Sequence, residues 1–233
     1  MARHRKAKMV EIFSSIQGEG LRIGERQIFI RFHGCNLKCG FCDVNKRKRP
    51  VSVDAKKVLK DIDSLNAGHT HNTVSITGGE PLLHSDFLKN LLPEIAERGL
   101  KVYLETNATL VDELKETIKH VDMISVDIKL PSVSGNAPCW QQHRKFLRAA
   151  FKKEFFVKIV VSKNLDISEF DEAVKLMRSI SFDLPFVIQP ETKKNSRSLN
   201  ISAKKLLELQ ERALKSLNHV LVIPQAHKML GVR

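Results

Sequence analysis

Apolar residues recur along this chain with two different spacings, which alternate from one segment to the next. Short runs with the two-residue period of a half-buried strand alternate with longer stretches that have the spacing of an amphipathic helix. Strands are predicted at residues 28–32, 73–77, 101–106, 123–127, 155–161, 186–189 and 220–223. Helices are predicted at residues 54–65, 85–98, 112–119, 138–153, 168–179 and 202–216, beginning near Asp54, Ser85 or Asp86, Ser168 and Ser202. Gly99 is expected to stop the second helix.

The regular alternation of strands and helices predicts an α/β fold with a largely parallel sheet and right-handed crossovers. About six core strands fit a partial, open parallel β/α barrel better than a complete eightfold one. The sequence contains no internal repeat, low-complexity segment or obvious linker. Residues 1–233 are therefore predicted to form a single domain, with residues 1–8 as a flexible basic extension.

Polar residues follow several of the predicted strands directly, at their C-terminal ends. In parallel sheets and barrels this is the edge that carries chemistry. One such residue would be weak evidence, but four groups at matching positions predict an active site there. The groups are Thr77–Glu80, Glu105–Asn107, Asp127 with Lys129, and Gln189–Pro190.

Composition narrows the class of protein. The chain has 233 residues, and its 42% hydrophobic content is enough for a substantial core. No apolar run approaches the roughly 20 residues that span a bilayer, and the basic start lacks the apolar region of a secretory signal. We therefore expect a soluble cytoplasmic protein with no membrane contact.

The charge is strongly positive, with 39 Lys and Arg against 26 Asp and Glu. The cations are scattered in pairs and short clusters, which is more typical of a solvated surface or of attraction for small anions. With one Tyr and one Trp, a stacking platform for nucleic acid is poor. Direct nucleic-acid binding is not expected.

Three of the 4 cysteines, Cys35, Cys39 and Cys42, are spaced C-x3-C-x2-C in one loop. They cannot all pair with one another, so they predict a metal or redox site in a reducing compartment. Three thiolates on one short loop favour an iron–sulfur cluster with one open iron. Zinc is the alternative, with three ligands or with a fourth from His33, His69 or His71. Cys139 is predicted to be an idle thiol.

The cysteine spacing resembles the motif of the radical S-adenosylmethionine (radical SAM) superfamily. Residues 77–81, Thr-Gly-Gly-Glu-Pro, resemble its glycine-rich motif, in which Gly78 and Gly79 would let the backbone approach the amino group of the cofactor. The resemblance implies a 4Fe–4S cluster on Cys35, Cys39 and Cys42, with S-adenosylmethionine on the open iron. Its reductive cleavage gives a 5′-deoxyadenosyl radical, while the protein supplies placement.

Flanking motifs resemble one family in this superfamily, 7-carboxy-7-deazaguanine synthase, from about residue 9 to the C-terminus. They are Glu-Ile-Phe-Ser-Ser-Ile-Gln-Gly-Glu-Gly at 11–20, Arg31, and Pro-Gln-Ala-His-Lys-Met-Leu-Gly-Val-Arg at 224–233. The resemblance implies conversion of 6-carboxy-5,6,7,8-tetrahydropterin to 7-carboxy-7-deazaguanine with release of ammonia, a step toward queuosine, archaeosine and other deazapurines. It also implies a homodimer and an electron donor such as flavodoxin or ferredoxin. A glycyl-radical activating enzyme and a zinc-stabilised RNA-binding protein are the alternatives.

The resemblance also implies roles for individual residues. Catalytic roles fall on the three cysteines, Glu19 and His227, and the Glu19 carboxylate can also pair with the edge of the pterin. The S-adenosylmethionine site would comprise Phe41, Cys42, Asp43, Gly79, Ser125, Asp127, Lys129, Gln189, Pro190, Glu191 and Thr192. The substrate site would comprise Ile16, Gln17, Gly18, Arg31, Thr77, Glu105, His227 and the terminal carboxylate of Arg233. A guanidinium such as that of Arg31 can clamp the substrate carboxylate in a bidentate manner.

One position departs from the family. After Cys-Asp the family commonly has threonine, whose hydroxyl helps to bind magnesium, whereas this chain has Val44. Valine offers no oxygen, and magnesium prefers oxygen ligands. A magnesium ion near Asp43 and Val44 would have to rely on Asp43, substrate and water, so the sequence argues against the usual magnesium site.

Overall fold

The computed structural model describes residues 6–42, 49–194 and 196–232. Its strands are β1 (Ala7–Ile16), β2 (Arg26–Phe32), β3 (Val51–Val53), β4 (Thr73–Gly78), β5 (Lys101–Thr106), β6 (Met123–Ile128), β7 (Glu154–Val161), β8 (Phe186–Pro190) and β9 (Val220–Val222). Its α-helices are α1 (Ala55–Leu65), α2 (Ser85–Glu97), α3 (Val111–Thr117), α4 (Pro131–Ser134), α5 (Trp140–Ala150), α6 (Ile167–Arg178), α7 (Ala203–Leu214) and α8 (Ala226–Leu230). The 3₁₀ turns are η1 (Gly20–Arg22), η2 (Pro81–His84) and η3 (Ile118–His120).

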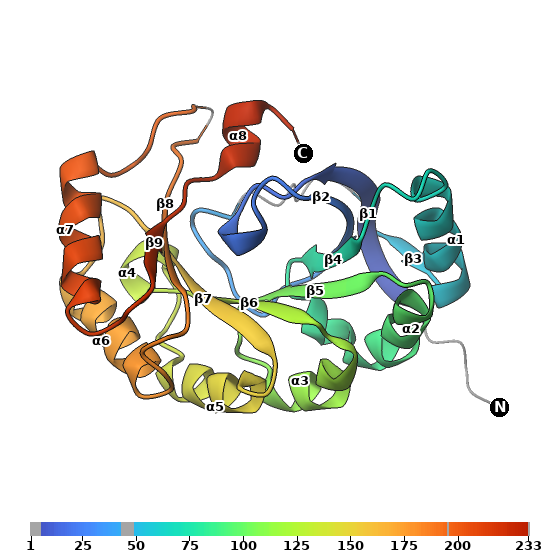
Figure 1. The fold of residues 1–233 in the computed structure, drawn as a ribbon, viewed down its shortest axis with the longest axis horizontal. Helices are drawn as coiled ribbons and strands as arrows, with labels where there is room; N and C mark the ends of the chain where they lie inside the picture. Colours follow the sequence, from blue (N-terminus) through green and yellow to red (C-terminus); the bar gives the residue numbers. More distant parts are fainter. Residues whose placement is uncertain (1–5, 43–48, 195, 233) are drawn as a thin grey trace.

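All these strands join one sheet in the order β3-β1-β2-β4-β5-β6-β7-β8-β9. Strands β2 and β4 to β9 run parallel, and β1 is antiparallel to both β2 and β3. The sheet curls into an incomplete barrel, and helices cover its outer face (Figure 1). The predicted open parallel β/α barrel is therefore confirmed.

The sequence pattern missed the N-terminal edge of the sheet. The pairing of β1 with β2 shifts between Met9 and Glu11, and such an irregularity breaks the period-two pattern by which a strand is recognised. Residues 7 and 8 lie in β1, so the flexible extension predicted over residues 1–8 is wrong for these two. Residues 1–5 lie outside the described part of the chain.

Helix ends follow local capping chemistry. As predicted, α1 starts after Asp54, whose side chain accepts a hydrogen bond from the Lys57 N–H. The start predicted at Ser168 is wrong, because Asp166 is the N-cap of α6 and accepts from the Ser168 N–H. Helix α5 is also shorter than the predicted 138–153 at both ends.

Alternation along the strands separates the two faces of the sheet. The outward side chains, such as Ile30 and Ile76, are fully buried beneath the helices. At the base of the barrel the inward face is apolar, with a cluster of Tyr103, Met123, Phe156 and Val187. Nearer the C-terminal ends of the strands the inward face is polar. This change of polarity predicts a closed floor and a polar site above it.

Gly20 allows the turn η1 to pack closely against the apolar cluster at the base of the barrel. Gly20 has φ +64, and a Cβ atom on it would lie 2.3 Å from the Phe156 ring. Only a residue without a side chain allows that approach. In the described residues, no helix has the length and apolar content that crossing a membrane requires.

Candidate active site

A cavity of about 530 Å³ opens at the C-terminal ends of the parallel strands. It brings together most of the residues predicted for the site. Lining it are Ile16, Gln17, Gly18, Glu19, Arg31, Cys35, Cys39, Phe41, Cys42, Thr77, Gly79, Glu105, Ser125, Asp127, Lys129, Gln189, Glu191, Thr192 and His227. Pro190, at the end of β8, is buried and is not among the lining residues. The predicted residues Asp43, Val44 and Arg233 lie outside the described residues, because 43–48 and 233 are not described.

Backbone hydrogen bonds join the glycine-rich motif to the end of β2 and to the cysteine loop, which is residues 33–42. The Gly79 N–H donates to the Phe32 carbonyl at 3.1 Å, and the Glu80 N–H donates to the Gly34 carbonyl at 2.8 Å. A Cβ on Gly78 (φ +144) would lie 2.3 Å from the Phe32 oxygen, and one on Gly79 would lie 2.0 Å from the Gly34 oxygen. The close approach that these glycines permit is therefore to the end of β2 and the start of the cysteine loop. Contact of Gly79 with a cofactor stays a prediction.

Replacing Gly79 with alanine is expected to displace this loop. The new methyl group would overlap the Gly34 carbonyl, and overpacking of this kind usually costs about 1–3 kcal/mol. We expect a melting temperature lower by a few degrees and less than half the wild-type iron after reconstitution. Gly68→Ala is the matched control, because its Cβ would meet nothing nearer than Thr70 Cγ2 at 3.6 Å. Normal iron uptake by Gly79→Ala would contradict this role.

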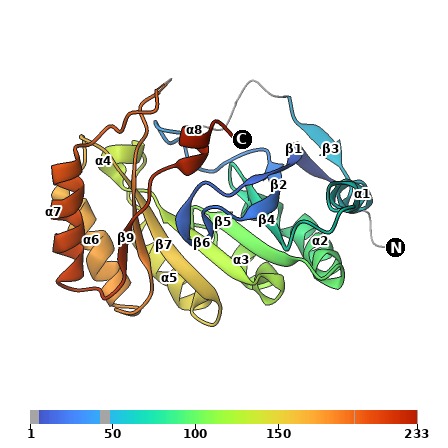
Figure 2. The ribbon, with the colours of Figure 1, turned by 45° about the horizontal axis from the view of Figure 1, so that its top comes forward.

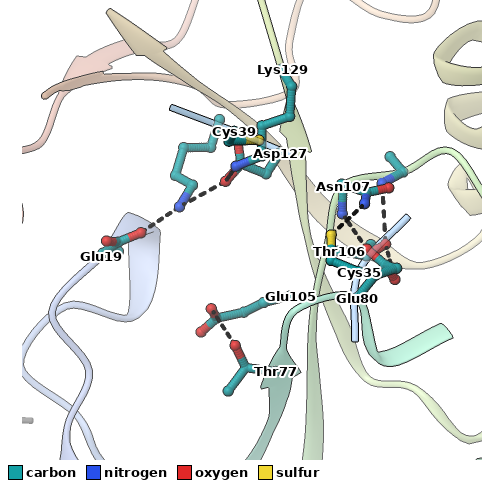
Figure 3. Close-up of polar contacts among 12 residues, drawn as sticks. Glu19, Cys35, Cys39, Thr77, Glu80, Glu105, Thr106, Asn107, Asp127 and Lys129 are labelled. Atoms are coloured by element: carbon teal, nitrogen blue, oxygen red, sulfur yellow. Dashed lines mark hydrogen bonds and ion pairs between the residues drawn. The ribbon is translucent and has the colours of Figure 1, made fainter. Parts of the chain in front are cut away.

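Two asparagines direct amide groups at the cysteine sulfurs. Asn136 Nδ2 donates to Cys39 Sγ at 3.3 Å, and Asn107 Nδ2 lies 3.8 Å from Cys35 Sγ. Cys35 and Asn107 lie side by side in Figure 3, where β5 ends. Burial raises the pKa of the Cys35 and Cys39 thiols, so their deprotonation would be coupled to metal binding. Amide donors around the sulfurs suit a thiolate-ligated cluster, whose electronics they tune.

The zinc alternative needs His33, His69 or His71 if it is to have a fourth ligand. Among residues 6–42, 49–194 and 196–232, no three His, Cys, Asp or Glu side chains, the three cysteines included, are grouped to hold a single ion, so the grouping favours neither zinc nor a cluster. One candidate histidine, His71, is engaged elsewhere: its Nε2 lies 2.8 Å from Ser14 Oγ, and its Nδ1 lies 3.2 Å from Asn66 Oδ1. His71 therefore ties a loop to β1.

A row of alternating charges crosses the cavity. Lys158, from β7, makes an ion pair with Glu19 and lies 3.2 Å from Asp127 Oδ2, which also accepts from Lys129 Nζ at 2.6 Å. Lys129 Nζ lies 5.1 Å from the centre of the Phe41 ring. Figure 3 shows Glu19 at one end of this row, with Asp127 and Lys129 at the other. The row runs from the loop after β1 to the edge of the cysteine loop.

The charges in this row stabilise one another. Burial alone would raise the pKa of Glu19, but the nearby Lys158 charge and hydrogen bonds from Gln225 and Lys158 outweigh it and lower that pKa. Burial would also lower the pKa of Lys158, but Asp127 and Glu19 raise it well above its usual value. Both groups are therefore ionised at neutral pH.

A second polar group lies on β4 and β5. Glu105 accepts hydrogen bonds from Gln17 Nε2 at 2.9 Å, Ser75 Oγ at 3.1 Å and Thr77 Oγ1 at 3.2 Å. Next to it on β2, Arg31 Nε pairs with Glu11 Oε1 at 3.2 Å. These contacts fix a carboxylate and a guanidinium on one wall, a pattern suited to a ligand with N–H donors and a carboxylate.

The loop after β1 contacts the start of α8 at the mouth of the cavity. The Ala226 N–H donates to the Gly18 carbonyl at 2.9 Å, and a Cβ on Gly18 would lie 2.4 Å from His227 Nδ1. Helix α8 consequently sits beside the loop after β1 (Figure 2). Gln225 Nε2 adds a hydrogen bond to Glu19 Oε1 at 2.8 Å.

Sequence reasoning missed several residues of the site, among them Lys158, Gln225 and Asn136. Lys158 had a signal, because it is the one charged residue within the apolar run Phe155–Val161, and a buried lysine needs anionic partners. Gln225 lay inside the C-terminal motif but had no assigned role. Asn136 had no sequence signal, since only the fold brings it to Cys39.

His143 supports the turn after β5, whose Asn107 side chain contacts Cys35. Its Nε2 lies 3.2 Å from the Asn107 carbonyl, and its Nδ1 is buried with no hydrogen-bond partner among the described residues. A proton on Nδ1 would therefore be a buried donor with no acceptor. Burial lowers the pKa of His143 to about 4, which keeps the ring neutral at physiological pH.

Acid is expected to destabilise the fold through this histidine. Because its folded pKa is below its ordinary value, the stability it contributes is present above pH 6.5 and is lost as the pH falls toward 4. From pH 7 to pH 5 the loss is about 2 kcal/mol. His143→Gln keeps an N–H donor but does not titrate, so its melting temperature should fall by ~4–8 °C less over that range. His219→Gln, at an exposed position, is the control, and equal falls in His143→Gln and wild type would contradict a neutral His143.

The site fits the groups that the cysteine motif implies. Among the described residues, two buried oxygens, Asp127 Oδ1 and Gln189 Oε1, have no hydrogen-bond partner, and both residues line the cavity. Buried acceptors are normally paired, so each is suited to an N–H or O–H donor of a bound ligand. S-adenosylmethionine carries an ammonium group, hydroxyls and an adenine amine. The three cysteines, with amide donors around two of them, suit the cluster.

Comparisons with known proteins agree with this chemistry. The model of the Radical SAM superfamily matches residues 29–177. The chain is 40% identical to the 7-carboxy-7-deazaguanine synthase of Geobacter sulfurreducens over 97% of each chain, and 34% identical to that of Methanothermobacter thermautotrophicus over 98% of each. The solved structure of QueE from Escherichia coli has a TM-score of 0.63 at 21% identity, covering 93% of this chain and 92% of that chain, and so shows a shared fold. The chain belongs to the radical SAM superfamily and, within it, to the 7-carboxy-7-deazaguanine synthase family.

Proposed function

We propose that this protein converts 6-carboxy-5,6,7,8-tetrahydropterin to 7-carboxy-7-deazaguanine and ammonia, as a carbon–nitrogen lyase of 7-deazapurine biosynthesis. The observation that carries the proposal is family membership along nearly the whole chain. The cavity supports it, because the three cysteines and most of the residues predicted for the pterin line the same cavity. The product is the precursor class from which queuosine and archaeosine are made.

Cys35, Cys39 and Cys42 would hold the 4Fe–4S cluster. With S-adenosylmethionine bound, the cluster supplies a one-electron reductive cleavage that generates the radical. Asp127 Oδ1 and Gln189 Oε1, which accept no hydrogen bond from any described residue, would accept from S-adenosylmethionine. The chain would thus hold S-adenosylmethionine at the C-terminal ends of β6 and β8.

A second set of lining residues suits a reduced pterin. Glu105, held by Gln17 and Thr77, would accept from N–H groups on the edge of the pterin. Arg31 would bind the carboxylate through the guanidinium nitrogens that do not face Glu11. His227 on α8 would close the site over the substrate, because α8 packs against Gly18. These residues orient the ring and exclude water while the radical exists.

The finer assignments rest on family resemblance. We propose a homodimer, a cytoplasmic location and a small electron-transfer protein, such as flavodoxin or ferredoxin, as donor. Magnesium is not expected to be required, because Val44 supplies no oxygen ligand.

The test is an anaerobic assay of the reconstituted protein with dithionite, S-adenosylmethionine and 6-carboxytetrahydropterin, with and without magnesium, followed by mass spectrometry. We expect 7-carboxy-7-deazaguanine at similar rates in both conditions. Deoxyadenosine without the deazaguanine would keep the radical chemistry and reject the substrate. Neither product, from protein with an intact cluster, would reject the proposed function.

A further inference from the structure

Lys158 stands between two carboxylates that face different parts of the cavity. Its side chain is 8% exposed. It pairs with Glu19 Oε2 from the loop after β1 and lies 3.2 Å from Asp127 Oδ2 on β6. An ammonium group has three N–H donors, so one lysine can serve both carboxylates at once.

Each carboxylate is held through one oxygen by this lysine. On Asp127, Lys158 and Lys129 both contact Oδ2, and Oδ1 is buried with no hydrogen-bond partner in the part of the chain that the structure describes. On Glu19, Lys158 takes Oε2 while Gln225 donates to Oε1. The lysine therefore fixes the direction of both groups and leaves Asp127 Oδ1 available to a ligand.

We propose that Lys158 is a positioning residue that joins the substrate site to the S-adenosylmethionine site, by orienting Glu19 for the first and Asp127 for the second. This inference rests on the proposed function. The physical reason is that a buried carboxylate without a cation nearby either takes up a proton or turns away. Lys129 cannot replace Lys158 at Glu19, because its ammonium group reaches Asp127 and the Phe41 ring.

The proposal makes a specific prediction for binding. Lys158→Met should weaken the binding of both ligands, each by roughly tenfold or more. Glu19→Gln should weaken mainly the binding of 6-carboxytetrahydropterin, and Asp127→Asn mainly that of S-adenosylmethionine. Dissociation constants are measured by anaerobic calorimetry on cluster-loaded protein without a reductant, so that no turnover consumes the ligands.

Double-variant cycles separate positioning from a general structural effect. Added to Glu19→Gln, Lys158→Met should cause little further loss of pterin affinity. Added to Asp127→Asn, it should cause little further loss of S-adenosylmethionine affinity. Lys158→Arg, which keeps a cation that can reach both carboxylates, should regain part of both affinities. Lys152→Met, at an exposed position before the start of β7, is the control and should bind both ligands normally.

Several outcomes would overturn the proposal. Loss of only one affinity in Lys158→Met would restrict the lysine to one site, and fully additive effects in both cycles would remove the coupling. Melting temperature and iron content accompany each variant. If Lys158→Met does not take up the cluster, the same cycles with Lys158→Gln, which keeps a polar side chain without the charge, decide the question.

Ligand binding by the wild-type protein distinguishes failure of the proposed function from failure of the role proposed for Lys158. Wild-type protein that binds S-adenosylmethionine but not 6-carboxytetrahydropterin would reject the pterin substrate. Wild-type protein that binds both, with Lys158→Met also binding both normally, would reject only the role of Lys158.

Discussion

Replacing Cys39 with alanine is expected to abolish the cleavage of S-adenosylmethionine. Two thiolates cannot hold a cluster that the motif builds on three, so the variant should be nearly colourless after reconstitution. Deoxyadenosine formation should fall to background, while the fold persists because Cys39 is only partly buried at the rim of the cavity. Iron analysis, visible absorbance and deoxyadenosine assays measure the effect.

Cys139 provides a matched control for this experiment. It is partly buried, its thiol contacts the Ala137 carbonyl at 3.6 Å, and it does not line the cavity. Cys139→Ala should keep wild-type iron content and activity. Equal loss of iron in both variants would mean that cluster assembly depends on general thiol content and would contradict the assignment of the three-cysteine motif.

The second large effect is expected at Arg31. Arg31→Met should weaken the binding of 6-carboxytetrahydropterin by about 30-fold or more, because removing one partner of a hydrogen-bonded charge pair costs at least ~2 kcal/mol. Binding of S-adenosylmethionine should be unchanged. Calorimetry without a reductant gives both dissociation constants.

Two further variants test the cause. Arg26→Met removes an arginine from the start of the same strand, where its side chain contacts Ser14, and should leave both affinities unchanged. Arg31→Met combined with Glu11→Gln removes the charge of the partner carboxylate as well. If this double variant regained pterin affinity, the loss would come from Glu11 rather than from a lost contact with the substrate carboxylate.

Most of the barrel could be predicted because its strands are buried on both sides and its helices have clear caps. Strand Thr73–Gly78 and helix Ala55–Leu65 are examples in which burial, length and turn chemistry agree. Strand β1 was missed because its bulge breaks the alternation, and β3 because its three residues are too few to show a period. Helix α8 has five residues, which is likewise too short for periodicity.

Site residues could be predicted where they belong to one sequence motif, and they were missed where only the fold brings them close to the site. The three cysteines and Gly79 are close in sequence to their motif partners. Asn136 contacts Cys39 from a turn 97 residues away, and a pattern of neighbouring residues cannot indicate a contact between positions so far apart in the sequence. Lys158 was recognisable as a charge in an apolar strand, but its partners on β6 and after β1 could be identified only from the structure.

The contact between the loop after β1 and the start of α8 has a consequence for how the cavity opens. Glu19 and Gln225 are 206 residues apart, whereas neighbouring parallel strands follow one another along the chain. Closing so long a loop is entropically unfavourable, and α8 has few buried residues of its own to offset it. This wall should therefore form last in folding and detach first in the native state. In native-state hydrogen exchange, the Ala226 amide should exchange well before the amides of β5 and β6, which would make transient release of α8 the route by which ligands enter.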